Sequence, residues 1–180
     1  EIPAADYFSR RKLIKYFTRE TMAAIVCIGE LLNGESISPQ TPFYFSSAET
    51  EMMDAYKEAC KVFDSGDLKF DSALFLEHAL PVISPLSHFK MMRNMVHCFI
   101  SIEYGLKGDN AAVMGGVAGL LVPAMLSGSK GDILIGAGKL HADSTAEGGF
   151  ALVNASELKE HPMLKSDKEA ICFFRENCNI

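Results

Sequence analysis

The chain has 180 residues and a mass of 19.7 kDa, the size of one compact domain or of one lobe of a two-lobed enzyme. Hydrophobic residues make up 48% and charged residues 22%, which excludes disorder and low-complexity sequence. The net charge of -6 predicts no partner among nucleic acids or anionic membranes, and no apolar run reaches the ~20 residues of a membrane span. We therefore expect a single folded domain over residues 1–180.

Apolar spacing predicts the first helix and the first strand. Apolar side chains recur three and four positions apart over residues 13–32, which is typical of a helix with one buried face. Asp6 or Ser9 can cap its start, and Gly34 suits the turn beyond its end. The aromatic residues of segment 41–47 then predict a short buried strand.

A second helix is predicted after this strand. Ser46 or Ser47 is placed to cap it, and Glu49 and Glu51 fall in its first turn, where carboxylates are favoured by the helix dipole. Residues 64–67 (Asp-Ser-Gly-Asp) are typical of a turn and are expected to end it.

The second half of the chain alternates helices with strands. Helices are predicted over residues 89–104 and 117–127, and Pro123 predicts a kink or an early end in the latter. Apolar runs of strand length predict strands over residues 111–114, 132–137, 150–154 and 171–174. This alternation indicates a layered α/β domain.

Two common kinds of site are not supported by the sequence. Residues 136–139 (Gly-Ala-Gly-Lys) follow a strand, but the dinucleotide fingerprint needs a glycine where His141 stands. The phosphate loop needs serine or threonine where Leu140 stands. Because the five histidines also lack the spacing of metal ligands, we expect no metal and no cofactor.

The cysteines suggest a reducing compartment. They are odd in number, lack CxxC spacing and lie mostly in apolar stretches, at positions 27, 60, 98, 172 and 178. They are expected to be the reduced, buried thiols of a cytoplasmic protein. Cys60 and Cys98 are predicted to face inward from their helices, where burial raises the pKa of a thiol and makes it inert.

The most informative segment is residues 110–119, a strand that runs into Gly115-Gly116 and then into a helix of small residues. Such an elbow presents one residue at a helix N-terminus, where the unpaired amides lower the pKa of a thiol and hold an oxyanion. A condensing enzyme keeps its nucleophile in this place. A simple packing turn is the other interpretation, since glycines also let a helix approach a sheet closely.

Several segments occur in an order that resembles a known family. They are Ile83-Ser84-Pro85, Arg93-Asn94-Met95, residues 101–110 (Ser-Ile-Glu-Tyr-Gly-Leu-Lys-Gly-Asp-Asn), and the strands at 131–138 and 147–153. With the first helix and strand, this order resembles the N-terminal half of the β-ketoacyl synthases, condensing enzymes of the thiolase superfamily, over residues 9–157. The resemblance implies a thiolase-like mixed sheet flanked by helices, with a first, central strand upstream of Glu1.

The departures from that family concern catalysis. Its elbow reads Thr-Ala-Cys-x-x-Gly, and the cysteine takes an acyl chain from an acyl carrier protein. Counting back from Gly119 places the equivalent of this cysteine at Gly116, after Met114 and Gly115. The family's two catalytic histidines belong to a C-terminal half that 180 residues cannot contain. The resemblance therefore implies a domain that cannot perform the condensation itself.

The resemblance also implies partners. In the family the elbow strand pairs antiparallel with its counterpart across a two-fold axis, here through Asn110, Ala111, Ala112, Val113 and Met114. The expected partner is a second copy or a full-length ketosynthase, with an acyl carrier protein as a further candidate. Met91, Met92, Met95 and Phe99 are candidates for an acyl tunnel, although such side chains more commonly pack a core.

Three functions stay open at this point. The first is a non-catalytic partner or chain-length subunit in fatty-acid or polyketide biosynthesis. The second is a fragment of a genuine condensing enzyme, an acyltransferase whose missing half supplies histidines. The third is a small acyl- or anion-binding module that uses the amides of Gly115 and Gly116.

Overall fold

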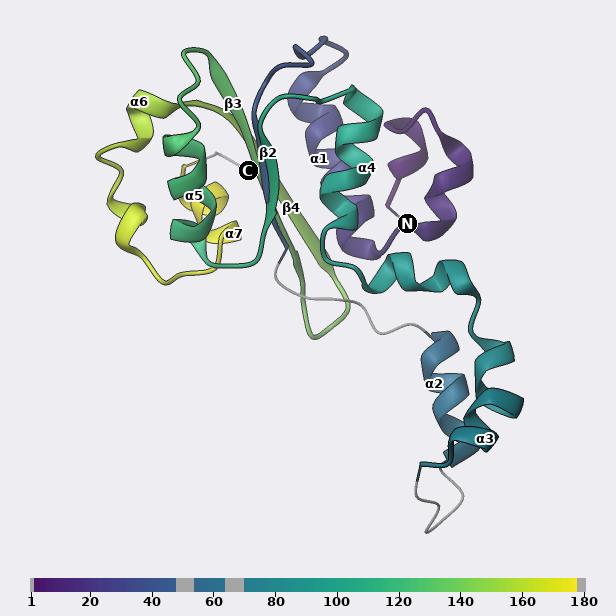
Figure 1. Cartoon of the computed structure of the whole chain (residues 1–180). Coiled ribbons are helices and arrows are strands. Elements are labelled where there is room, and N and C mark those ends of the chain that lie inside the picture. Colours follow the sequence, from purple (N-terminus) through teal and green to yellow (C-terminus); the bar gives the residue numbers. More distant parts are fainter. Residues whose placement is uncertain (1, 48–53, 64–69, 178–180) are drawn as a thin grey trace.

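The computed structural model describes residues 2–47, 54–63 and 70–177. Within them, one mixed sheet has the strand order β2-β1-β3-β4. Strand β1 (Phe43–Ser47) lies between β2 (Asn110–Val113) and β3 (Asp132–Leu140) and is parallel to both, and β4 (Ala146–Asn154) is antiparallel to β3. Helices cover both faces of the sheet (Figure 1), so the predicted α/β class and the mixed sheet are confirmed.

The helices divide between the two faces of the sheet. Helices α1 (Arg19–Leu32) and α4 (Met95–Tyr104) cover one face, and α5 (Val117–Leu126), α6 (Ala155–Leu158) and α7 (Ile171–Asn177) cover the other. Short 3-10 helices connect the larger elements at Ala4–Asp6, Arg11–Tyr16, Lys61–Phe63, Leu80–Val82, Pro85–Met91 and Pro162–Lys165.

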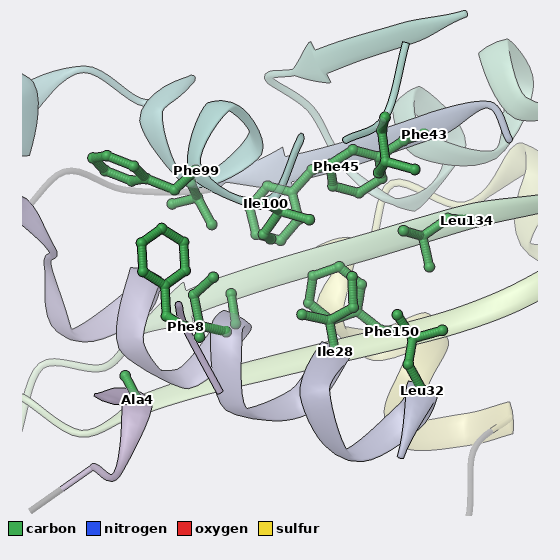
Figure 2. Close-up of a cluster of buried hydrophobic side chains, with 14 of the residues drawn as sticks. Ala4, Phe8, Ile28, Leu32, Phe43, Phe45, Phe99, Ile100, Leu134 and Phe150 are labelled. Carbon is green, nitrogen blue, oxygen red and sulfur yellow. The ribbon is translucent and has the colours of Figure 1, made fainter. Parts of the chain in front are cut away.

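Strand β1 is buried on both faces and joins the two halves of the core. Phe43 and Phe45 point toward α1 and α4, into a cluster that includes Ile28, Ile100 and Phe150 (Figure 2). Tyr44 points the opposite way, because side chains alternate along a strand, and it packs with residues of α5 and α7. A run of apolar residues buried on both sides is typical of a central parallel strand.

The sheet is continuous from β2 to β4. Phe43 pairs with Asn110 on one side and with Leu134 on the other, so β1 and β3 are direct neighbours. A further central strand would have to separate them. The described sheet therefore has no vacant position between β1 and β3, and the upstream central strand that the resemblance implies stays a prediction.

Two predicted helices begin later than expected. Helix α1 starts at Arg19 rather than near Leu13, and its cap is Thr18, whose side chain accepts a hydrogen bond from the amide of Thr21 at 3.1 Å. Asp6 and Ser9 therefore do not cap it. Helix α4 starts at Met95 rather than at Phe89. In both cases a 3-10 segment precedes the α-helix, and the apolar spacing of the sequence runs through both. Periodicity alone therefore could not place the boundary between them.

Two further predictions concern residues 171–174 and Pro123. Residues 171–174 belong to helix α7 and not to an edge strand, because Ile171 and Phe174 lie one helical turn apart and are buried together against the sheet. Helix α5 continues through Pro123 to Leu126. Proline has no backbone N–H, so Pro123 donates no hydrogen bond to the carbonyl of Gly119. Gly119 is exposed to solvent, and the helix continues past this missing bond.

A helical arm stands apart from the sheet and its covering helices (Figure 1). It comprises α2 (Asp54–Cys60), α3 (Ser72–Leu74), a π-helical turn at Phe75–Ala79 and the short helix Leu80–Val82. The helix Pro85–Met91 forms the base of the arm and packs against the Arg11–Tyr16 segment, where Phe89 contacts Tyr16. Its own core is a small cluster around Ala59, Ala79 and Ile83. Glu49, Glu51 and the turn predicted at 64–67 lie outside the described residues.

Candidate functional site

The candidate site is a pocket of about 290 Å³ where the three parallel strands end. Its lining includes Ser46 and Ser47 at the end of β1, residues 114–116 after β2, and Gly138 and Lys139 of β3. Arg93, Asp167 and Glu169 also contribute. Ligands of open α/β sheets bind at this edge, beyond the carboxyl ends of the strands. The structure thus brings the predicted elbow residues Met114, Gly115 and Gly116 into a pocket.

The elbow itself has the predicted form. Strand β2 ends at Val113, Met114 and Gly115 are exposed, and Gly116 is the N-cap residue of α5. The hydroxyl of Ser46 donates to the carbonyl of Gly115 at 2.8 Å and ties the end of β1 to the turn. No side chain caps α5, so its first amides depend on other partners.

A strap, residues 166–170, crosses the elbow and fills the space beside Gly116. The carbonyl of Lys168 accepts a hydrogen bond from the amide of Val117 at 2.8 Å. A Cβ atom on Gly116 would lie 2.5 Å from this carbonyl oxygen and 3.3 Å from that of Asp167. Position 116 therefore has neither a nucleophilic side chain nor space for one.

Glu20 and Ser47 form a buried pair beside the pocket that the sequence analysis missed. The hydroxyl of Ser47 lies 3.0 Å from both carboxylate oxygens of Glu20, and both residues are at least 95% buried. Gly138 makes room for the carboxylate, since a Cβ there would overlap it. The hydroxyl of Ser46 therefore contacts the Gly115 carbonyl and that of Ser47 contacts Glu20. The start of the next helix, which either serine was predicted to cap, lies outside the described residues. The two residues Glu20 and Ser47 are 27 positions apart, and no local sequence pattern indicates that they meet.

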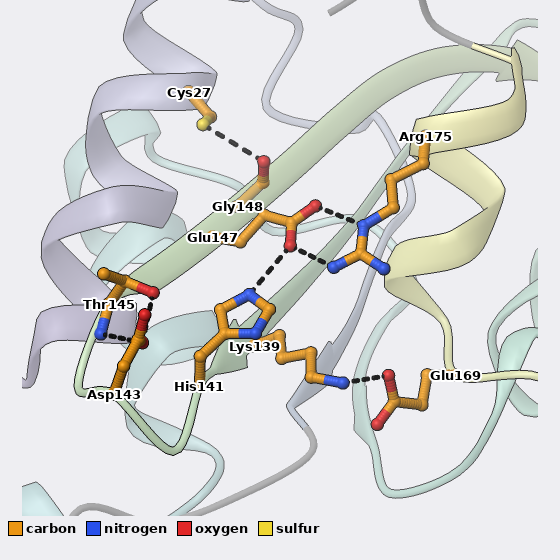
Figure 3. Close-up of polar contacts among 9 residues, drawn as sticks. All are labelled: Cys27, Lys139, His141, Asp143, Thr145, Glu147, Gly148, Glu169 and Arg175. Atoms are coloured by element: carbon orange, nitrogen blue, oxygen red, sulfur yellow. Dashed lines mark hydrogen bonds and ion pairs between the residues drawn. The ribbon is translucent and has the colours of Figure 1, made fainter.

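Ion pairs tie the C-terminal segment to the β3–β4 hairpin (Figure 3). Lys139 and Glu169 pair at the pocket. Farther along the hairpin, Glu147 accepts a hydrogen bond from Nε of Arg175 at 2.7 Å and a second from its Nη2, and lies 3.0 Å from Nε2 of His141. The Arg175 guanidinium, and to a lesser degree His141, lowers the pKa of the Glu147 carboxyl. These contacts hold the strap and α7 in place.

The four cysteines of the described residues lie away from the pocket. Cys27, Cys60, Cys98 and Cys172 are unpaired, and none of them lines it. Burial raises the pKa of Cys98, as predicted, and that of Cys27, which keeps both thiols protonated. Cys60 is exposed, and the prediction that it faces inward is wrong, because the arm holding it has too small a core to bury it.

The predicted pairing strand lies at the edge of the sheet. The amide of Phe43 donates to the carbonyl of Asp109. Because hydrogen-bonding direction alternates along a parallel strand, Ala111 and Val113 face β1, whereas Asn110 and Ala112 turn their backbone groups outward. No other described strand pairs with this outer edge.

The residues predicted for an acyl tunnel do not meet at the elbow. Phe99 belongs to the core cluster beneath α1 and α4, and Met95 packs against it. Met91 and Met92 are exposed near the base of the arm. None of the four lines the elbow pocket, and their tunnel role stays a prediction.

The described residues show neither a metal cluster nor a membrane span. No cluster of three or more histidine, cysteine or acidic side chains with the geometry of a metal site occurs within 2–47, 54–63 and 70–177. Over the described chain, helices of sufficient length and apolarity to span a bilayer are also absent.

Comparisons with known proteins found no relative of this chain. No protein-family model, no curated protein and no solved structure matches the chain.

Proposed function

We propose that this chain is a non-catalytic subunit with the thiolase-like fold of the N-terminal half of a β-ketoacyl synthase. It acts as a cytoplasmic partner in fatty-acid or polyketide biosynthesis, beside a second copy or a full-length ketosynthase and near an acyl carrier protein. The observation that carries the proposal is the Lys168 carbonyl in the space of a Gly116 side chain. An acyl-transferring elbow needs a nucleophile there with room to be acylated.

Two further observations support the proposal. The amide of Val117, which would otherwise be open to an oxyanion, is already bonded to Lys168. The outer edge of β2 is unpaired within the described sheet, and unpaired edges are common places for strand pairing between chains. A closed elbow and an open strand edge together favour association over catalysis.

The proposal is tested by intact-mass measurement after incubation with malonyl- and long-chain acyl-coenzyme A. We expect no covalent acyl adduct on the wild-type chain. Gly116→Cys restores the thiol but is also expected to remain unacylated, because the strap has to move to admit it. Gly119→Cys is the control for a thiol that has room near the elbow, since a Cβ at that exposed position meets no atom within 4 Å. An acyl group on any wild-type side chain near the elbow contradicts the proposal.

A further inference from the structure

The arm carries an unusual amount of exposed apolar surface. Phe70 is 71% exposed and Leu76 is 61% exposed, and Leu80, Val82 and Leu86 are each exposed by more than 40%. The fully buried part of the arm is limited to a few side chains around Ala79. So small a core does not account for a stable independent unit.

The exposed area is close to what a dimer requires. A large apolar or aromatic side chain presents about 150–250 Å² in full, so these side chains, with those at the base of the arm, offer several hundred Å². A standard stable interface takes ~800 Å² from each partner, and monomers rarely leave apolar patches of more than a few hundred Å² in water. The arm is therefore of the right size to be covered by one further chain.

The base of the arm adjoins the edge strand. Met91 and Met92 are exposed there, and the next residue, Arg93, lines the same pocket as Met114 at the end of β2. The base of the arm and the end of β2 thus meet at one pocket. A partner that pairs with β2 therefore lies beside the base of the arm.

We infer that the arm is a clasp for a second copy of this chain, covered in a symmetric dimer whose two-fold axis passes beside β2. A two-fold interface uses the same patch on both subunits, so each arm is covered by its counterpart or by the partner's body. The inference rests on the proposed function, because it takes β2 as the pairing edge. It adds that the dimer depends on the arm as well.

The test is sedimentation velocity over a dilution series, with the full chain and with Phe70→Glu/Leu76→Glu. Both side chains are exposed, so charge there removes interface area without opening a cavity. We expect a wild-type dimer whose Kd rises by at least about tenfold in the double variant. Leu126→Glu, at a site that is 70% exposed at the far end of α5, is the matched control and leaves the Kd unchanged.

Amide hydrogen exchange provides a second measurement that needs no variant. Residues 70–92 of the wild-type chain are expected to exchange more slowly at concentrations where the dimer forms. A dimer that Ala112→Pro dissociates but the arm variant does not, with no protection of the arm, overturns the inference and leaves the proposed function intact. A chain that is monomeric at every concentration also overturns it, and the proposed function then depends on binding to a full-length ketosynthase.

Discussion

At Gly116 the absence of a side chain lets the strap close the elbow. The backbone of the strap thereby reaches the start of α5, where the Lys168 carbonyl bonds the amide of Val117. A helix N-terminus leaves several amides without partners, so this carbonyl acts in place of a side-chain cap. The same contact that stabilises the elbow also removes the space for a nucleophile.

Substitution of glycines in this segment should have opposite effects at two positions. Gly116→Ala forces a Cβ to 2.5 Å from a backbone oxygen and is expected to lower the free energy of unfolding by about 1–3 kcal/mol. Gly119→Ala meets open space within a helix and is expected to raise it by up to about 1 kcal/mol. Urea unfolding of both variants checks the pair. If both variants change the free energy of unfolding equally, the strap moves away from position 116 at little cost.

His97 is expected to make stability depend on pH. Its ring stacks on Phe43 with centroids 4.7 Å apart, Nε2 has no partner among the described atoms, and burial lowers its pKa below 6.5. The unfolded chain therefore takes up the proton first, so stability is full above pH 6.5 and falls below it, by at most about 1.4 kcal/mol per pH unit. In His97→Leu this component disappears. An unchanged slope of unfolding free energy between pH 7 and 5 would contradict the assignment.

Among the elements, α7 and the β3–β4 hairpin position the strap. Phe173 and Phe174 anchor α7 in the core, while Arg175 on the same helix bonds Glu147 on β4. The strap precedes α7 directly and pairs with β3 through Glu169 and Lys139. Its position over the elbow therefore depends on contacts at both of its ends.

Loss of the Glu147 carboxylate should loosen this arrangement. Glu147→Gln is expected to cost about 1 kcal/mol at pH 7, a modest value because the Arg175 side chain is 42% exposed and screened by water. Arg175 lowers the pKa of Glu147, so the contribution is present above the ordinary pKa of 4.5 and is lost as the pH falls through the lowered one. Glu176→Gln, in the more exposed pair with Lys168, is the control and should change stability by less than about 0.5 kcal/mol. Thermal unfolding measures both, and similar losses would show that the two hydrogen bonds from Arg175 to Glu147 have no special role.

The elements differ in how far the sequence could predict them. β1 and β3 were predictable, because continuous apolar runs bounded by turn residues are typical of buried strands. The four apolar residues from 171 fit a strand or a helix equally well, and only packing against the sheet decides between them. The elbow could be located from its glycines, whereas the strap and the Glu20–Ser47 pair are long-range contacts that leave no local pattern.

At the scale of the whole molecule, the surfaces favour association. Strand β2 is an edge strand, the elbow beside it is closed, and the arm extends apolar side chains away from the body. Exposed apolar surface of this kind is typical of interaction sites. The proposed function places the association along β2.

Sedimentation velocity of two variants, Ala112→Pro and Ala112→Val, tests pairing along β2. Each variant is measured alone and mixed with a full-length β-ketoacyl synthase. Proline removes the outward amide of Ala112 and is tolerated at a sheet edge, whereas valine keeps the amide and favours a strand. We predict that the wild-type chain and Ala112→Val associate and that Ala112→Pro stays a folded monomer. Association of Ala112→Pro with the wild-type affinity, or no association of the wild-type chain with either partner, would contradict the account.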